Sequence, residues 1–211
     1  MDDWLPGVPA LVESWYAGQE QGTAVAAILF GDVDPSGKLT ATIANKREDY
    51  SDWPNYPGDD NQVKYAEGIY VGYRHFDKAN IAPLFPFGFG LSYTTFAYSS
   101  ATAPRVTHLG VPDIVTLKVK NTGTRAGDEI VELYVRDLHP RVERPIRELK
   151  GFKRVSLQPN EEKSVSIPLD DSSFSYWDVV SHKWRANPGD YAIDIGSSSR
   201  DIRATVKTTL R

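Results

Sequence analysis

The second half of the chain alternates apolar and polar residues with a period of two. Four runs show this pattern: Val115 to Val119, Val131 to Val135, Val165 to Leu169 and Tyr191 to Ile195. Successive side chains of a strand point to opposite faces, so each run has one face for a core and one for water. Turn-forming residues separate the runs at Asn121-Thr122-Gly123, Gln158-Pro159-Asn160 and Asn187-Pro188-Gly189. We therefore predict about seven short antiparallel strands packed as a two-sheet sandwich.

The stretch from Tyr65 to Phe96 is rich in aromatic rings, glycine and proline. It reads YAEGIYVGYRHFDKANIAPLFPFGFGLSYTTF, in which nine of 32 residues are Tyr or Phe and four are Gly. Rings supply a large buried area, and glycine lets the backbone turn or approach closely beside them. Because Pro83 and Pro86 forbid a continuous helix, we predict a strand or short helix that leads into an irregular connection between two packed bodies.

The residues from Val8 to Gly31 predict a helix whose first part is preceded by apolar side chains. Ala24, Ala27 and Ile28 form a small-residue face, which indicates close packing on a sheet. Gly31 is well placed as the left-handed residue after the last turn. A turn cluster, DVDPSGKL, follows, and residues 39–43 are expected to start a short strand.

Several motifs, in order along the chain, resemble glycoside hydrolase family 3, the β-glucosidase-type family. WYAGQEQGTAVAAILFGDVDPSGKL resembles a run in the α/β second domain of that family, and YAEGIYVGYR followed by PFGFGLSYTTF resembles the segment that closes it. Ala17 and Thr40 stand where the family usually has Pro, which loosens a turn at most. Three further stretches resemble the fibronectin type III-like domain that ends many members: NTGTRAGDEIVELYVRD, RPIRELKGFKRVSLQPNE and NPGDYAIDIGSSSRDIR.

The resemblance implies a mainly β fold. We expect a fibronectin type III-like, immunoglobulin-like β-sandwich preceded by a partial α/β segment. Residues 1–92 would be the carboxy-terminal remnant of the α/β sandwich domain, and residues 93–211 would be the fibronectin type III-like domain. Residues 1–90 hold 13 acidic and 6 basic side chains, whereas residues 91–211 hold 15 and 18. Opposite net charges would favour docking of the two halves, although two solvated surfaces remain the alternative.

Family 3 enzymes, as the resemblance implies, retain anomeric configuration with an Asp nucleophile from a (β/α)₈ barrel and a Glu acid/base from the second domain. Such a barrel takes roughly 200 to 250 residues. The chain has 211, of which a sandwich uses about 110, so there is no room for the barrel. The family places its acid/base upstream of the GQEQG-like helix, and neither Glu13 nor Glu20 matches that context. We therefore expect no catalytic residue in this chain.

Ser51-Asp52-Trp53 repeats the tripeptide around the nucleophile of the family. It follows the charged run from Lys46 to Asp49 and precedes a loop rich in Pro and Gly, so we interpret the match as coincidence. The neighbouring rings are candidate substrate-binding residues, because aromatic rings stack on the apolar face of pyranoses. These candidates are Tyr50, Trp53 and Tyr56. Packing of the same rings against a neighbouring domain is the alternative.

Other ligand classes find little support. The histidines lie far apart, at His75, His108, His139 and His182, so we expect neither a metal nor another cofactor. Basic residues recur every third position from Arg141 to Lys153, but Pro145 and Gly151 break any helix that would align them, and we expect no nucleic acid. No run approaches the ~20 apolar residues of a membrane span, so we expect a soluble protein of unknown compartment.

Two smaller features suggest local roles. Arg74 is interpreted as an ion-pairing or ring-stacking residue at the junction of the two halves. Trp177 and Trp184 flank a hairpin-like stretch and are expected to pack in the sandwich or at its rim. An exposed pair of tryptophans would instead suggest carbohydrate binding.

Three functions follow as hypotheses. In the first, the chain is the carboxy-terminal portion of an enzyme that hydrolyses O-glycosyl bonds of β-glucosides or oligosaccharides, and it acts as a scaffold that is inactive alone. In the second, it is a module that binds carbohydrate or a partner bearing the barrel, and in the third a minimal autonomous β-glucosidase. An incomplete α/β sheet would leave an apolar face uncovered around Val25, Ile28 and Leu29. We therefore expect a homo-oligomer, or residues 1–60 wrapped on the sandwich.

Overall fold

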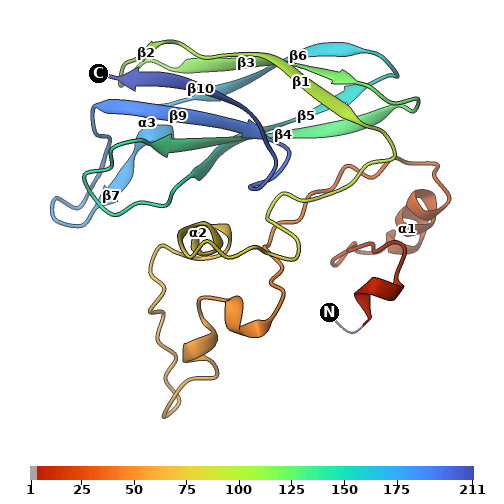
Figure 1. Cartoon of the computed structure of the whole chain (residues 1–211), viewed down its shortest axis with the longest axis horizontal. Helices are drawn as coiled ribbons and strands as arrows, with labels where there is room; N and C mark the ends of the chain where they lie inside the picture. Colours follow the sequence, from red (N-terminus) through yellow and green to blue (C-terminus); the bar gives the residue numbers. More distant parts are fainter. Residues whose placement is uncertain (1–3) are drawn as a thin grey trace.

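Two β-sheets stack face to face and form the second half of the molecule (Figure 1). The computed structural model describes residues 4–211. One sheet has the order β1-β3-β6, with β1 at Phe96–Thr102, β3 at Asp113–Asn121 and β6 at Glu162–Leu169. The other has the order β2-β10-β9-β4-β5. Its strands are β2 (Val106–Thr107), β10 (Ile202–Leu210), β9 (Gly189–Gly196), β4 (Gly127–Asp137) and β5 (Glu148–Leu157).

The core lies between the sheets and is built from the predicted alternation. Val115 pairs with Ile167 and Leu117 with Val165 in one sheet, while Leu133 pairs with Ile195 in the other. All of these side chains are at most 3% exposed and belong to one apolar cluster. The mainly β, fibronectin type III-like sandwich predicted from the sequence is confirmed. The boundary between residues 92 and 93 stays a prediction.

Before Phe96 the chain forms helices and loops, which lie along one side of the sandwich (Figure 1). The helical elements are η1 (Leu5–Gly7), α1 (Gln21–Leu29), η2 (Arg47–Asp49), η3 (Trp53–Asn55) and α2 (Tyr73–Lys78). Where the aromatic-rich stretch predicted a strand or a short helix, the structure has the short helix α2. None of the helices in residues 4–211 is long and apolar enough to cross a membrane.

The helix predicted between Val8 and Gly31 is much shorter than expected. It begins only at Gln21, and α1 buries none of its residues, so the expected packing of its alanines on a sheet is wrong. The physical reason is that no strand lies among residues 4–95 for this helix to cover. Gly31 does adopt the left-handed conformation after the last turn, with φ of +80°.

The strand expected at residues 39–43 is also absent. Ile43 makes a single antiparallel bridge with Phe85, and Leu39 exchanges backbone hydrogen bonds with Phe89 and Gly88. These contacts tie the turn cluster to the PFGFG segment without forming a ladder. Asp34 completes the attachment, because its carboxylate accepts hydrogen bonds from the Ser92 hydroxyl and the Tyr93 N–H.

Asn121 is a buried polar residue at the place where the chain enters the sandwich. It is fully buried, and its amide donates to the carbonyls of Arg125 and Leu157. Its Oδ1 accepts hydrogen bonds from the Thr94 hydroxyl and the Gly123 N–H. One side chain therefore satisfies four groups where the chain enters β1 and leaves β3.

Asn121→Ala is expected to lower the free energy of unfolding by about 3 kcal/mol, because the substitution leaves buried donors and acceptors without partners. Urea denaturation checks this value. Lys120→Ala, at the exposed neighbouring position of β3, serves as the control and should change stability little. Equal effects of the two substitutions would contradict the role given to Asn121.

Candidate functional site

The predicted substrate-binding aromatics lie together around a shallow hollow. Tyr50, Trp53 and Tyr56 line a volume of 320 Å³ with Arg47 and Asp52, where η2 leads into η3. The Tyr50 hydroxyl accepts a hydrogen bond from the Ala44 N–H at 3.1 Å, and its ring meets that of buried Phe76 edge-on at 6.1 Å. One wall of the hollow is thus held in place.

The other wall of the hollow is open to water. Tyr56 is 67% exposed, and Asp52 is an exposed residue at the start of η3. Asp52 follows a loop and a 3₁₀ turn, and its context differs from a carboxylate at the end of a barrel strand. The arrangement offers ring faces and polar edges to a ligand, and its role in substrate binding stays a prediction.

Glu13 and Glu20, the other carboxylates considered from the sequence, make local hydrogen bonds. Glu13 accepts a hydrogen bond from the Trp15 N–H, and Glu20 accepts one from the Thr23 hydroxyl at the start of α1. His75 hydrogen-bonds the Asp49 carbonyl at 3.1 Å. Within residues 4–211, no group of three or more His, Asp or Glu side chains is placed to hold a metal ion.

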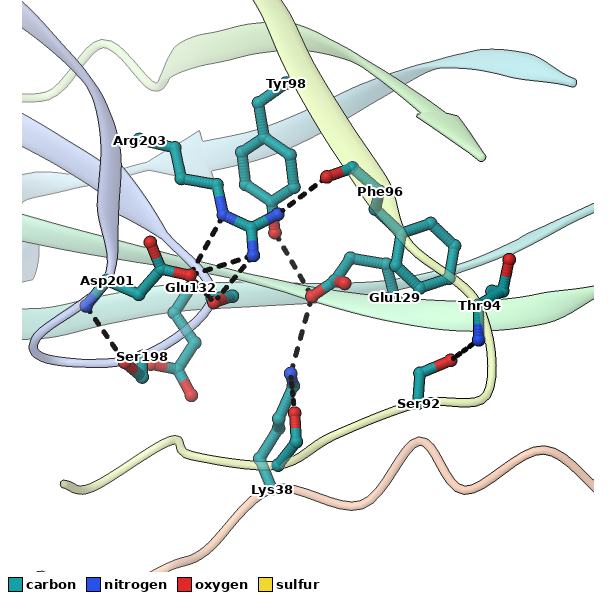
Figure 2. A network of polar contacts seen from close by, with 12 residues as sticks. Lys38, Ser92, Thr94, Phe96, Tyr98, Glu129, Glu132, Ser198, Asp201 and Arg203 are labelled. Carbon is teal, nitrogen blue, oxygen red and sulfur yellow. Dashed lines mark hydrogen bonds and ion pairs between the residues drawn. The ribbon is translucent and has the colours of Figure 1, made fainter. Parts of the chain in front are cut away.

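A second candidate site is the polar junction between the loop-rich segment and the sandwich (Figure 2). Lys38 reaches from the segment to the Glu129 carboxylate at 3.5 Å and to the Gly90 carbonyl at 3.1 Å. The Tyr98 hydroxyl donates to the same carboxylate from β1. Glu129 is 4% exposed, so Lys38 supplies the opposite charge that a buried carboxylate needs.

Arg203 closes the junction from β10. Its guanidinium lies 4.7 Å from the centre of the Tyr98 ring and donates to the Phe96 carbonyl and to Asp201. Hydrogen bonds from Arg203 and from the Ser197 hydroxyl hold the pKa of Asp201 below its usual range. Burial and the nearby Glu129 carboxylate raise the pKa of Tyr98, so this phenol stays a hydrogen-bond donor.

Glu132 is a buried carboxyl group at the same junction. Burial raises its pKa from 4.5 to about 7, although the Tyr134 hydroxyl donates to it and Lys38 favours its charged form. Gly88, at φ of +82°, lies against this carboxyl, and a Cβ there would clash with its two oxygens. Glycine at this position therefore allows the PFGFG backbone to cover Glu132.

A third set of contacts holds α2 on the sandwich. Asp77 pairs with Arg147 at 3.4 Å and with Arg200 at 3.1 Å. The Tyr73 hydroxyl accepts the Leu149 N–H at 2.9 Å, and the Tyr73 ring packs on Phe87. Arg74 lies 6.0 Å from the Tyr73 ring centre, where the sequence placed a ring-stacking residue.

Two family models match this chain, one over the loop-rich segment and one over the sandwich. The glycosyl hydrolase family 3 C-terminal domain matches residues 1–93, and the fibronectin type III-like domain matches residues 129–199. The chain matches the carboxy-terminal region of glycoside hydrolase family 3 proteins. Thermostable beta-glucosidase B of Acetivibrio thermocellus is 46% identical over 201 residues, which are 94% of this chain and 26% of that protein.

Solved structures of the family agree. The GH3 beta-glucosidase of Bifidobacterium adolescentis superposes with a TM-score of 0.88 and 40% identity, over 94% of this chain and 29% of its own. The beta-glucosidase of Kluyveromyces marxianus in complex with glucose gives 0.91 and 39%, over 99% of this chain and 25% of its own. The chain thus spans about a quarter of the length of the relatives it matches.

The raised pKa of Glu132 predicts that the stability of the chain depends on pH. Glu132 has a higher pKa in the folded chain than in the unfolded chain, so its stabilising contribution is complete below about pH 4.5 and is lost as the pH rises through about 7. Glu132→Gln should match the parent chain at pH 5 and exceed it at pH 8, by about 3 kcal/mol at most. Urea unfolding across this range checks the difference.

Glu162→Gln provides the control, because Glu162 pairs with Lys118 at the exposed surface. The stability of this variant relative to the parent chain should not change between pH 5 and pH 8. A parent chain whose stability relative to Glu132→Gln is constant from pH 5 to 8 would contradict a buried carboxyl that is neutral in the folded state.

Proposed function

We propose that this chain is the carboxy-terminal portion of a β-glucosidase-type retaining glycoside hydrolase, in which it serves as scaffold and does not supply the catalytic carboxylates. The similarity to beta-glucosidases over 94% or more of the chain, but only about a quarter of their length, carries this proposal. The substrates of the intact enzyme would be β-glucosides or oligosaccharides, as the names of the relatives indicate.

The junction supports the scaffold role. Three anchoring points bind the loop-rich segment to the sandwich: Lys38 at Glu129, Asp77 at Arg147, and Arg125 at the Gly31 carbonyl. Charged groups buried in pairs have a fixed geometry, because displacement of either partner leaves an unpaired charge. The sandwich would therefore hold residues 30–92 rigidly while the rest of the enzyme supplies the nucleophile and the acid/base.

The exposed apolar residues of the first thirty positions would form the docking surface for that remaining portion. Tyr16 is fully exposed, Phe30 is 84% exposed and Leu29 is 62% exposed. Leu11, Val12 and Trp15 are each close to half exposed. Apolar residues gathered in one segment without cover are typical of protein interfaces.

The hollow at Tyr50, Trp53 and Tyr56 favours a second function, contact with sugar at the rim of the pocket of the intact enzyme. The ring of Tyr50 is fixed from behind, while that of Tyr56 is open to solvent. This combination of a fixed apolar surface and free polar edges suits a carbohydrate ligand.

A chromogenic β-glucoside assay tests the proposal. The 211-residue chain should show no turnover above buffer, because two carboxyl groups about 5 to 5.5 Å apart are needed for retaining hydrolysis. Turnover that is lost in Asp52→Asn or in another single carboxylate variant would show instead a minimal autonomous β-glucosidase. A full-length family 3 beta-glucosidase in the same buffer provides the positive control.

The uncovered segment predicts self-association of the isolated chain. We expect light scattering to give the mass of a dimer or larger oligomer, and Leu29→Glu or Phe30→Glu to reduce that mass, since a charge opposes burial of the exposed face. Ala24→Glu adds the same charge to α1 at an exposed small residue and should have less effect. A parent chain that is monomeric at all concentrations would contradict this expectation.

A further inference from the structure

A small β-ribbon at the end of the sandwich displays two tryptophans to solvent. It consists of β7 (Tyr176–Asp178) and β8 (Lys183–Arg185), which form a two-stranded sheet of their own. The ribbon follows α3 (Asp171–Phe174), and Figure 1 shows α3 and β7 at one end of the sandwich. Trp177 and Trp184 are direct cross-strand partners. Their rings meet edge to face, with centres 5.6 Å apart and planes at 74°.

The sandwich core does not use these rings. Trp177 is 48% exposed and Trp184 is 68% exposed, although each already contacts the other. They are therefore surface residues of the ribbon, so of the two expected positions, packing in the sandwich or at its rim, packing in the sandwich is wrong. Indole is the largest side chain and gains most from leaving water, so two exposed neighbours leave a large apolar area uncovered.

The ribbon is anchored firmly at its base. Phe174 is 1% exposed and packs edge-on against buried Tyr191. Arg144, whose side chain is 5% exposed, donates to the Phe174 carbonyl and lies 5.7 Å from the centre of the Tyr176 ring. The strand that carries Trp177 thus begins in the core of the sandwich.

The turn of the ribbon is fixed as well. The Asp178 carboxylate accepts hydrogen bonds from the Val180 N–H and the Ser181 hydroxyl, and it pairs with Arg185 at 3.5 Å. The two indoles are consequently held at a set angle before any ligand arrives, which reduces the entropy lost on binding.

The size of the ribbon favours a small ligand over a protein. Stable protein interfaces take about 20 to 30 residues from each partner, whereas the ribbon and its turn span residues 176–185. An exposed indole face is close in size to one pyranose ring. Lys183 and Arg185 adjoin Trp184 on β8, where successive side chains point to opposite faces, so the face that carries the indoles offers apolar ring surface.

We propose that Trp177 and Trp184 form a carbohydrate-binding platform for β-linked gluco-oligosaccharides, separate from the aromatic hollow at Trp53. The ring substituents of a β-glucosyl unit are equatorial, so both of its faces present C–H groups that stack on an indole, while its hydroxyls point outward to water. The platform binds and performs no chemistry. The choice of a β-linked glucan rests on the proposed function, because it is the compound class that a β-glucosidase would meet.

Calorimetric titration of the 211-residue chain with cellotetraose tests the platform. The parent chain should bind, and Trp184→Ala and Trp177→Ala should each weaken binding by about tenfold or more. Trp184→Phe keeps a stacking surface and should restore part of the affinity. Phe152→Ala removes a ring that is also 68% exposed, but on β5, and should leave binding unchanged. Matching urea midpoints of the variants establish that each is folded.

Trp53→Ala separates the two aromatic sites. Unchanged binding in this variant supports the ribbon, whereas binding lost only in Trp53→Ala would place the sugar in the hollow and overturn the platform. Absence of any heat with the parent chain at millimolar cellotetraose would also overturn it. An oligomer that Trp184→Ala converts to monomer, without sugar binding, would assign the pair to self-association instead. None of these results depends on whether the chain hydrolyses β-glucosides.

Discussion

Burial of charged side chains between the loop-rich segment and the sandwich is the interaction on which the described arrangement depends. Glu129 and Glu132 lie on β4 and are each 4% exposed, and Lys38 of the segment that covers them pairs with Glu129. A carboxylate is costly to bury without a partner. The junction therefore balances the Lys38–Glu129 and Arg203–Asp201 ion pairs against one carboxyl, Glu132, whose pKa is raised to about 7.

This balance explains why the segment remains folded although it has no sheet of its own. Few of its side chains are buried, and its order comes from attachment: Asp77 to two arginines of the sandwich, and Gly88 against Glu132. Asp77 fits the unequal charge of the two halves, because an acidic residue of the segment pairs with basic residues of the sandwich. Lys38 is the reverse case, since a basic residue of the segment pairs with Glu129 of the sandwich. The residues of α1 stay unburied although this helix is also attached, through a hydrogen bond from the Tyr93 hydroxyl to the Ile28 carbonyl, because none of the sheets in residues 4–211 lies against its face.

The sequence predicted the parts of the fold that depend on local periodicity. Val115 to Val119 and Val131 to Val135 each alternate, and both are strands whose apolar faces meet in the core. The junction could not be predicted in the same way, because Glu132 and Tyr134 occupy the polar face of that alternation, which a strand normally turns to water. Another segment covers this face, and only tertiary contacts reveal it. The helix expected from Val8 failed for a related reason, since its small-residue pattern presupposed a sheet that these residues do not contain.

Exposed aromatic residues have different physical origins in the two halves. Around α1 the uncovered side chains belong to a segment that packs on none of the described sheets, and Leu11 and Val12 of the same segment are exposed as well. The ribbon of Trp177 and Trp184 is the opposite case, because its base is in the core and its turn is closed by Asp178. A side chain held rigidly in solvent has already lost its conformational freedom without gaining burial. That cost is recovered only when a ligand covers the rings, which favours binding as the reason for their exposure.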